Sequence, residues 1–404
     1  MPLAQDNHQE TPAGLQHPHA GLKVLELARI LAGPWIGQTL ADLGADVIKV
    51  ESPAGDDTRK WGPPFIERAD GSTDAAYFHA CNRGKRSLVI DFTTSEGQQQ
   101  IRELASQADV VIENFKLGGL AKYGLDYASL SAINPRLIYC SVTGFGQDGP
   151  YAARAGYDFI IQGMSGIMDL TGEPDGPPQK IGVAFADIIT GLYGTIAIQA
   201  AIAQRERTGE GQHIDMSLLD SMTGVLANQA MNYLVSGVPP HRMGNAHPNI
   251  TPYSVFPCSD GHFILAVGND RQFRNFVTAL NRPDIADNPA YADNPLRIRN
   301  REQLVAEIAA ETSRRAKDEL LTLCEQYGVP AGPINSLDDV FADPQVMARG
   351  MKIDCVDKHG QSLPGLRTPI RFSNAVLATG KAAPMLGDDN AVLDGLKGWP
   401  PQPR

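Results

Sequence analysis

Asp187 is the residue whose type and position most directly suggest chemistry in this sequence. It lies within residues 182–191, after an apolar stretch and before a helical pattern. A carboxylate in that position can act as a covalent nucleophile towards an acyl carbon. By residue type and position alone, the more common role is an N-cap that accepts a backbone N–H of the first helical turn. The two roles are compatible, because the partial positive charge at a helix N-terminus favours the ionised carboxylate.

Two further sites could bind anions. The basic run at residues 83–86 contains Lys85 and could hold phosphate groups. An isolated basic turn is more often solvated surface, so this run carries weight only together with its neighbours. His247, which precedes Pro248, could bind a substrate carboxylate or order a loop, and the pattern favours the loop.

The sequence predicts neither a metal site nor a disulfide framework. Its five cysteines are scattered without paired spacing, which favours a reducing compartment, and we expect the cytoplasm. Residues 1–20 are polar, show neither a signal-peptide nor a transit-peptide pattern, and are expected to form a flexible tail. The histidines of that tail, His8, His17 and His19, have no neighbours with metal-ligand spacing.

The composition is that of an ordinary globular protein. The 404 residues are 42% hydrophobic and 20% charged, and the formal net charge is −11. Such a balance argues against a general surface for nucleic acids or anionic membranes, so an anionic ligand must meet a local basic cluster. We find no apolar run of the roughly 18 residues that a membrane span requires.

The elements that must position these residues alternate between strands and helices. Strands are predicted at residues 24–27, 46–50, 87–91, 109–112 and 137–141, with helices between them. This alternation predicts a doubly wound, largely parallel sheet. The helix that follows Asp187 is predicted to end at Gly209. The pattern of apolar residues changes near residue 248, which indicates a smaller second α/β unit.

A sheet of this class binds ligands at the carboxyl ends of its strands, and Glu51 at the end of the second strand is compatible with NAD. The glycines after the first strand, Gly33 and Gly37, lack the spacing that places a pyrophosphate on a helix N-terminus. A nicotinamide-dependent dehydrogenase is therefore a weak alternative.

Several blocks of sequence, taken together and in order, resemble the class III coenzyme A transferases of the formyl-CoA transferase type, a family related to the 2-methylacyl-CoA racemases. They lie at residues 21–26, 32–34, 40–51, 55–59, 82–87, 111–115, 141–146, 156–162, 182–191, 208–212, 244–248 and 328–333. No single block is decisive, but their order and coverage make the resemblance specific.

The resemblance implies an interlocked, ring-shaped homodimer. Each chain would contain a large Rossmann-like, CoA-binding domain at residues 21–217, linker helices at residues 218–247 and a small α/β domain at residues 248–330. Residues 331–404 would return to the large domain.

The reaction that the resemblance implies is transfer of CoA from an acyl-CoA donor to a carboxylic acid. Asp187 would attack the thioester to give an aspartyl anhydride, which CoA thiolate converts to an aspartyl-CoA thioester. A carboxylate with an unperturbed pKa near 3.9 would need no general base at neutral pH. Coenzyme A and acyl-CoA are thus substrates, and we expect no permanently bound cofactor or metal.

The resemblance also suggests contact residues. Tyr157 and Gln162 match positions that face the acyl group. For CoA it suggests Arg29, Ile30 and Leu31 at the edge of the first strand, Lys85 and Lys122 at the phosphates, and Asn114 with Phe115 near the adenosine. Phe115 is equally compatible with an ordinary core aromatic, and Ser52 departs from an arginine in the family.

Tyr157 separates the alternatives within the family. The racemases use a histidine there, because racemisation needs two proton-transfer groups, whereas a phenol with a pKa near 10 is a poor base. A CoA-transferase is therefore favoured over a racemase, and the presence of Asp187 disfavours a non-catalytic CoA-binding paralogue. Residues 244–253 resemble the branch that accepts short dicarboxylates, so we expect succinyl-CoA as donor and an acid such as glutarate as acceptor.

Overall fold

The computed structural model describes residues 16–68 and 70–402, which form two compact units. The first unit contains the described residues up to 167, residues 181–228 and residues from 344 onwards. The second contains residues 168–180 and 229–343.

The first unit is built around a parallel sheet. Its strands and helices are β1 (Lys23–Glu26), α1 (Ala32–Asp42), β2 (Asp46–Glu51), η1 (Asp57–Lys60), β3 (Phe65–Glu67), β4 (Thr73–Ala75), α2 (Ala76–His79), β5 (Arg86–Val89), α3 (Ser95–Ala105), β6 (Val110–Glu113), η2 (Ala121–Tyr123), α4 (Tyr127–Ile133), β7 (Ile138–Thr143), α5 (Asp158–Met164), α7 (Phe185–Thr208), β8 (Gln212–Ser217), α8 (Leu218–Gly224), α16 (Pro344–Ala348), β12 (Lys352–Val356), β13 (Ser362–Leu366) and η4 (Asn390–Leu393).

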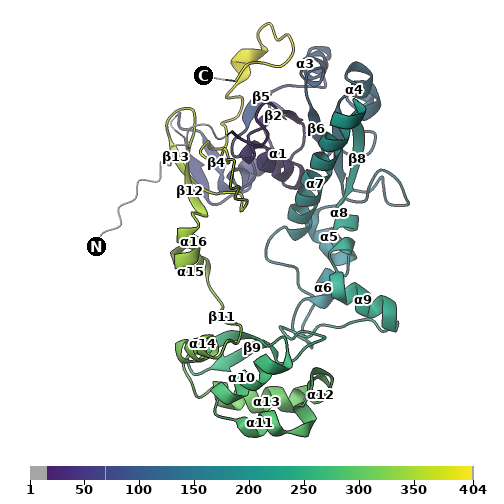
Figure 1. Ribbon diagram of the computed structural model, residues 1–404. Helices are drawn as coiled ribbons and strands as arrows, with labels where there is room; N and C mark the ends of the chain where they lie inside the picture. The colour runs from purple at the N-terminus through teal and green to yellow at the C-terminus, as the bar shows by residue number, and fades with distance from the viewer. Residues whose placement is uncertain (1–15, 69, 403–404) are drawn as a thin grey trace. The chain divides into compact units, whose positions relative to one another are not determined.

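The six strands of the main sheet lie in the order β5-β2-β1-β6-β7-β8, and all neighbours are parallel. The chain winds outwards from β1 through β2 to β5, returns to β6 beside β1, and then winds the other way. Ligands of open parallel sheets bind where the order reverses in this manner. In this sheet that point lies between β1 and β6. Figure 1 labels β6, with β2 and β5 on the other side of the reversal.

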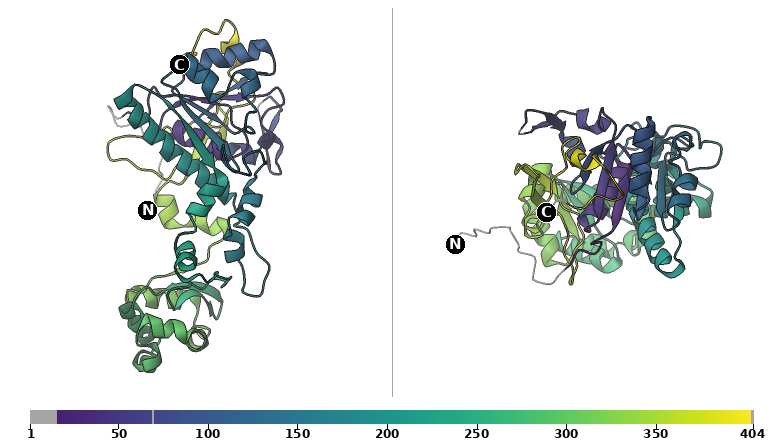
Figure 2. Two further views of the ribbon diagram at one scale, coloured as in Figure 1. Left: turned by 90° about the vertical axis from the view of Figure 1, so that its right-hand side faces the viewer. Right: turned by 90° about the horizontal axis from the view of Figure 1, so that it is seen from above.

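Two hydrophobic clusters cover the two faces of the sheet. On one face α1 and α7 pack against alternate strand residues through Ile36, Leu40 and Ile198, and on the other face α3 contributes Ile101 and Leu104. Figure 2 shows the sheet with these helices in two further views. The strands are therefore buried on both faces, as is usual for parallel sheets.

Helix α7 lies against α1 because two of its residues have no side chain. A Cβ on Gly191 would lie 3.0 Å from the carbonyl oxygen of Ala32, and one on Gly194 would lie 2.5 Å from Cδ1 of Ile36. Gly209, at φ 80°, ends the helix at the predicted position. This close approach brings the first turn of α7 near the N-terminus of α1.

Within the described residues, α7 is also the one helix whose length and composition would suffice to cross a membrane. The sequence analysis predicted this helix but found in it no apolar run long enough to cross a membrane. Its buried positions, which include Gly191, Ile198 and Arg205, belong to the core of the first unit, and core helices of soluble proteins meet the same criterion.

The predicted strands of the sheet are present, with boundaries that differ by one or two residues. Residues 1–15 of the expected tail lie outside the described residues. The Nδ1 atom of His17 is 2.9 Å from the carbonyl oxygen of Val376, and the Nε2 atom of His19 is 2.6 Å from the amide nitrogen of Gln199.

The second unit contains a three-stranded antiparallel sheet, in the order β11-β10-β9, with helices packed on it. Its elements are β9 (Tyr253–Cys258), β10 (Gly261–Ala266), α10 (Asp270–Ala279), α11 (Pro283–Asp287), η3 (Pro289–Tyr291), α12 (Asn294–Arg299), α13 (Arg301–Thr312), α14 (Lys317–Gln326), β11 (Ala331–Pro333) and α15 (Leu337–Ala342), together with most of α6 (Ile167–Leu170) and α9 (Ala227–Ser236), whose first residues belong to the first unit. This unit extends beyond the 248–330 range of the predicted small domain.

Candidate functional site

The turns after β1 and β6 meet at the point where the strand order reverses. The backbone N–H of Arg29 donates to Oδ1 of Asn114 (2.9 Å), and the Asn114 amide donates back to the carbonyl oxygen of Arg29 (2.6 Å). The Arg29 guanidinium lies 5.6 Å from the centre of the Phe115 ring and 3.2 Å from a carboxylate oxygen of Asp57. The structure therefore brings together three of the predicted CoA contacts at one edge of the sheet.

Asp187 is the third residue of α7, one helical turn before Gly191, which packs against α1. The N-cap position is occupied by Ala184, so the N-cap interpretation of Asp187 is wrong. The N–H groups of Ala186 and Asp187 instead donate to Oδ1 of Asp158, at 2.8 and 3.4 Å. A carboxylate from the start of α5 thus satisfies donors that the first turn of α7 leaves unpaired.

Gln162 holds Asp158 in that position. Its amide nitrogen donates to Oδ2 of Asp158 (2.7 Å), and its amide oxygen accepts the N–H of Ile181 (2.9 Å). Because Gln162 is fully buried, the prediction that its side chain faces the acyl group is not supported. It orders the segment that leads to Asp187.

The Asp187 carboxylate is half-buried, and in the described residues no lysine or arginine forms an ion pair with it. Burial, with a further contribution from the charge of Asp158, raises the pKa of Asp187 to about 7. The sequence-based expectation of a fully ionised carboxylate is therefore wrong. Desolvation and like charge outweigh the helix dipole, so Asp187 keeps its proton to a higher pH than an exposed aspartate does.

Tyr77 on α2 adds a hydroxyl to this site. Burial and the nearby charge of Asp187 raise the pKa of Tyr77 to about 12, so it is protonated at neutral pH and can donate a hydrogen bond. The charges of Asp158 and Asp56 act on Tyr77 in the same direction. The Tyr77 ring packs edge-on against Trp61, with ring centres 5.3 Å apart.

The remaining predicted CoA residues differ in accessibility. Lys122 is exposed, with its ammonium 4.6 Å from the Tyr123 ring centre, whereas Leu31 is buried and cannot present its side chain to a ligand. Ile30 is half-buried with φ 72°. Phe115 packs edge-on against Phe92, at 5.5 Å between ring centres, as a partly buried core aromatic would.

The structure contradicts the prediction that Lys85 contacts the phosphates of CoA. Its side chain is fully buried and its ammonium donates to Glu26, to the carbonyl oxygen of Pro34 and to Asn82, at 2.8 to 2.9 Å. All three donors of the ammonium are therefore satisfied inside the unit, and none is left for a phosphate.

Tyr157 and His247 belong to different units. Tyr157 is 61% exposed at the start of α5, immediately before Asp158. His247 lies in the second unit, where its Nδ1 accepts the N–H of Asn249 (3.0 Å) and its ring packs edge-on against Tyr253. This geometry supports the interpretation of His247 as a residue that orders a loop.

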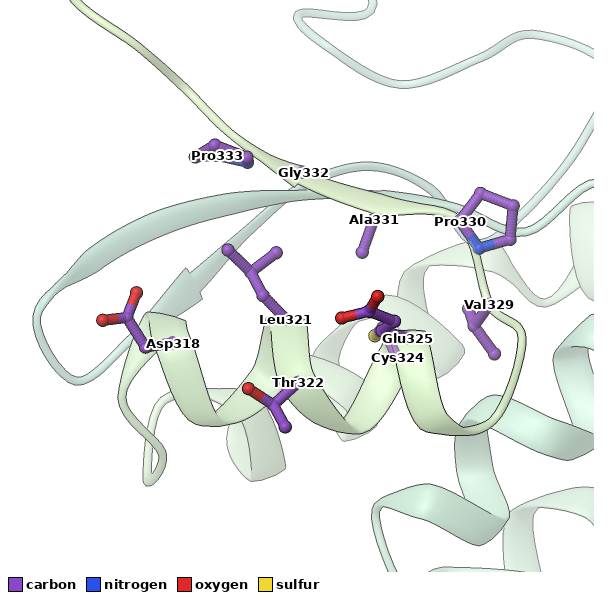
Figure 3. A pocket seen from close by; sticks show the side chains of 10 residues that line it. All are labelled: Asp318, Leu321, Thr322, Cys324, Glu325, Val329, Pro330, Ala331, Gly332 and Pro333. Atoms are coloured by element: carbon purple, nitrogen blue, oxygen red, sulfur yellow. The ribbon is translucent and has the colours of Figure 1, made fainter. Parts of the chain in front are cut away.

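A surface cavity of about 480 Å³ in the second unit lies between α14 and β11 (Figure 3). Asp318, Thr322 and Glu325 contribute its polar side chains. Two carboxylates and no basic residue make this cavity unsuitable for phosphates or dicarboxylates. Among the described residues, no group of His, Cys, Asp or Glu side chains is arranged to hold a metal ion.

Sequence reasoning missed Asp158 and Tyr77. Asp158 lies in one of the blocks that carry the resemblance, directly after Tyr157, but its contact with α7 joins residues 28 positions apart. Tyr77 lies near no motif to which a role had been assigned. A carboxylate at the start of a short helix was the only local signal for either residue.

Comparison with known proteins places the chain among CoA-transferases. The model of a family described as CoA-transferase family III matches residues 20–390. A succinate–glutarate CoA-transferase of Agrobacterium fabrum is 60% identical over 93% of this chain and 94% of its own, and a succinyl-CoA:glutarate CoA-transferase of Mus musculus is 42% identical over 92% and 84%. The crystal structure of a CAIB/BAIF family protein from Brucella suis, 64% identical, superposes with a TM-score of 0.84 over 94% of this chain and 99% of its own.

Proposed function

The chain belongs to CoA-transferase family III, and we propose that it transfers CoA from succinyl-CoA to glutarate or a similar short dicarboxylate through Asp187. The main observation in support of this chemistry is the environment of the Asp187 carboxylate. It is half-buried, has no basic partner in the described residues, and lies beside the edge where the strand order reverses. The choice of substrates rests on the names of the relatives that are 60% and 42% identical.

The proposed reaction proceeds through four acyl exchanges. An Asp187 oxygen attacks the thioester carbonyl of succinyl-CoA, and the C–S bond breaks. CoA thiolate departs, and a succinyl-aspartyl anhydride is formed. The thiolate attacks the aspartyl carbonyl, which releases succinate and forms an aspartyl-CoA thioester. Glutarate attacks this thioester and expels the thiolate. Finally, the thiolate attacks the glutaryl carbonyl of the new anhydride, which gives glutaryl-CoA and free Asp187.

The electrostatics of the site favour these covalent states. Ionised Asp187 is disfavoured by burial and by the charge of Asp158. Acylation converts the Asp187 carboxylate to a neutral anhydride or thioester, which removes that penalty. A carboxylate with a raised pKa is also more basic, and so more nucleophilic when ionised, than an exposed aspartate.

We place CoA at the crevice between β1 and β6, with Arg29, Asn114 and Phe115 near the adenosine and Lys122 at the phosphates. The strand order, 3-2-1-4-5-6 when the six strands are counted along the chain, supports a Rossmann-like, doubly wound domain. Tyr157, exposed beside Asp158, is placed to meet the acyl group.

We further propose a homodimer in the cytoplasm, with CoA esters as substrates and no permanent cofactor. Apolar side chains that monomers normally bury are exposed on neighbouring parts of α5 and α7 in the first unit. They are Phe159, Ile160, Met164, Leu192, Tyr193 and Ile196. A second copy of the chain, interlocked with the first, would cover this surface, which we call the α5–α7 face.

Mass spectrometry of the intact protein tests the mechanism. After mixing with succinyl-CoA and trapping with hydroxylamine, we expect a modified aspartyl group that maps to Asp187 and is absent from Asp187→Asn. Glutaryl-CoA should form when glutarate is added. A protein that binds CoA yet shows no adduct with several acyl-CoAs would contradict the proposal and favour a non-catalytic binding role.

A further inference from the structure

The turn between β1 and α1 contains an unfavourable backbone conformation. Ile30 has φ 72°, in the left-handed region that β-branched residues rarely adopt. Such conformations persist only where the surroundings impose them, and they are concentrated at functional sites. The turn that contains Ile30 is also the one whose Arg29 meets Asn114.

Asp56 imposes this conformation. Its two carboxylate oxygens lie 3.4 and 3.3 Å from the backbone nitrogen of Ile30, which donates to them. The N–H and hydroxyl of Thr58 donate to Oδ1 of Asp56 at 3.0 and 2.8 Å. Asp56 is 1% exposed, so its carboxylate has fixed partners and no access to solvent.

Lys49 fixes Asp56 and the other side of the turn. Its fully buried ammonium lies 2.9 Å from Oδ2 of Asp56, donates to the carbonyl oxygen of Ala28 at 2.8 Å, and pairs with Glu26 at 3.2 Å. Although burial alone would lower it, the pKa of Lys49 is raised by Glu26 and Asp56, so the ammonium stays charged. The Lys49–Asp56 pair therefore holds the residues on both sides of Arg29.

We propose that Asp56, anchored by Lys49, is a positioning residue that sets residues 29–31 in the shape that receives coenzyme A. This inference rests on the proposed function, in which that turn contacts CoA. Asp56 touches no substrate and acts through the backbone of Ile30. A turn fixed before binding loses less conformational freedom when CoA binds, which increases affinity.

The first test compares two buried aspartates. Asp56→Asn removes the charge that pairs with Lys49. Asp357→Asn is the control, because Asp357 is 7% exposed and ion-paired with Arg68 in the same unit, while its carboxylate otherwise accepts the N–H groups of residues 359 and 361. We expect Asp56→Asn to raise the Kd for CoA and the KM for succinyl-CoA about tenfold or more, with little change in kcat.

Asp357→Asn should lower Tm without changing KM. An Asp56→Asn protein that folds and binds CoA as tightly as the unmodified protein overturns the proposal. So does a control that raises KM as much as Asp56→Asn does.

A double-mutant cycle with Ile30→Gly keeps the proposal testable even if Asp56→Asn alone folds poorly. Glycine adopts φ 72° without strain, so a turn that carries the Ile30→Gly substitution depends less on the Asp56 carboxylate. We expect the effect of Asp56→Asn on the Kd for CoA, measured by calorimetry, to be smaller in the Ile30→Gly background. Equal effects in both backgrounds would show that Asp56 does not act through residue 30.

Arg29→Ala separates this inference from the proposed function. If Arg29→Ala weakens CoA binding and Asp56→Asn does not, the CoA site is correct and the positioning role is wrong. If neither substitution changes the Kd for CoA, the proposed CoA site fails and the positioning role fails with it. Weaker binding in both variants supports the two together.

Discussion

At the scale of single residues, the site combines Asp187, the proposed nucleophile, with a neighbouring carboxylate that makes it less acidic. Asp158 satisfies the first turn of α7 and places a second negative charge beside Asp187. Ionising Asp187 inside the folded protein therefore costs free energy. Two predictions follow from the sign of this shift.

Asp187→Asn should abolish CoA transfer, by at least about 10³-fold, and should also stabilise the protein above neutral pH. The pKa of Asp187 is near 3.8 when unfolded and about 7 when folded. Between these values the unfolded chain loses its proton while the folded one keeps it, so the native state loses stability as pH rises through this window. We expect the Tm of Asp187→Asn to exceed that of the unmodified protein at pH 8, and the difference to vanish near pH 4. A Tm lowered at pH 8 would contradict the raised pKa.

Asp158→Asn should move the pH dependence of the chemical step. In the proposed reaction only ionised Asp187 attacks the thioester, so single-turnover acylation by succinyl-CoA should increase with an inflection near pH 7. Removal of the Asp158 charge lowers the pKa of Asp187, so the inflection should move to lower pH. Asp148→Asn, which changes an exposed aspartate, should leave it in place. An unchanged inflection in Asp158→Asn would mean that burial alone sets the pKa of Asp187.

At the scale of elements, the contact between α1 and α7 places Asp187 near the edge of the sheet at which we propose that CoA binds. Gly191→Ala and Gly194→Ala should both gain helix propensity, by about 1 kcal/mol. The new methyl group at residue 191 meets a backbone oxygen of Ala32, whereas the one at residue 194 meets the flexible end of Ile36. We therefore expect Gly191→Ala to lower kcat more than Gly194→Ala does, with Tm measured alongside. Equal loss of activity in the two variants would contradict this role of the close approach.

The elements themselves were largely predictable from the sequence, and the contacts between them were not. Buried parallel strands alternate with helices in a pattern that is local in the chain, so β1, β2, β6 and β7 were predicted to within one or two residues. No local pattern places Tyr77 or Asp158 beside Asp187. For Lys85 the local pattern was misleading. It lies in a basic run that suggests phosphate binding, but its buried ammonium pairs with Glu26. The positive φ of Ile30 has no sequence signal at all, since the residue type argues against it.

At the scale of the whole molecule, the α5–α7 face and α9 carry more exposed apolar side chains than one chain would leave in water. On α9 they include Leu234 and Val235, which are 71% and 80% exposed, and on α7 Ile196 is 61% exposed. Apolar helix faces of this kind are typical of protein interfaces. Because the mass of one chain is 43.5 kDa, light scattering after size exclusion should give about twice that value for the proposed homodimer.

Ile196→Lys tests which surface forms that interface. A lysine placed in a closed apolar contact is costly to bury, so we expect this variant to dissociate or to lose thermal stability in a concentration-dependent manner. Ile133→Lys, a matched change at a 45% exposed residue on α4, should remain dimeric. If Ile196→Lys is as dimeric and as stable as the control, the α5–α7 face is not the interface. Loss of activity on dissociation would further indicate that the second copy completes the site around Asp187, whereas full activity in the monomer would show that each chain carries a complete site.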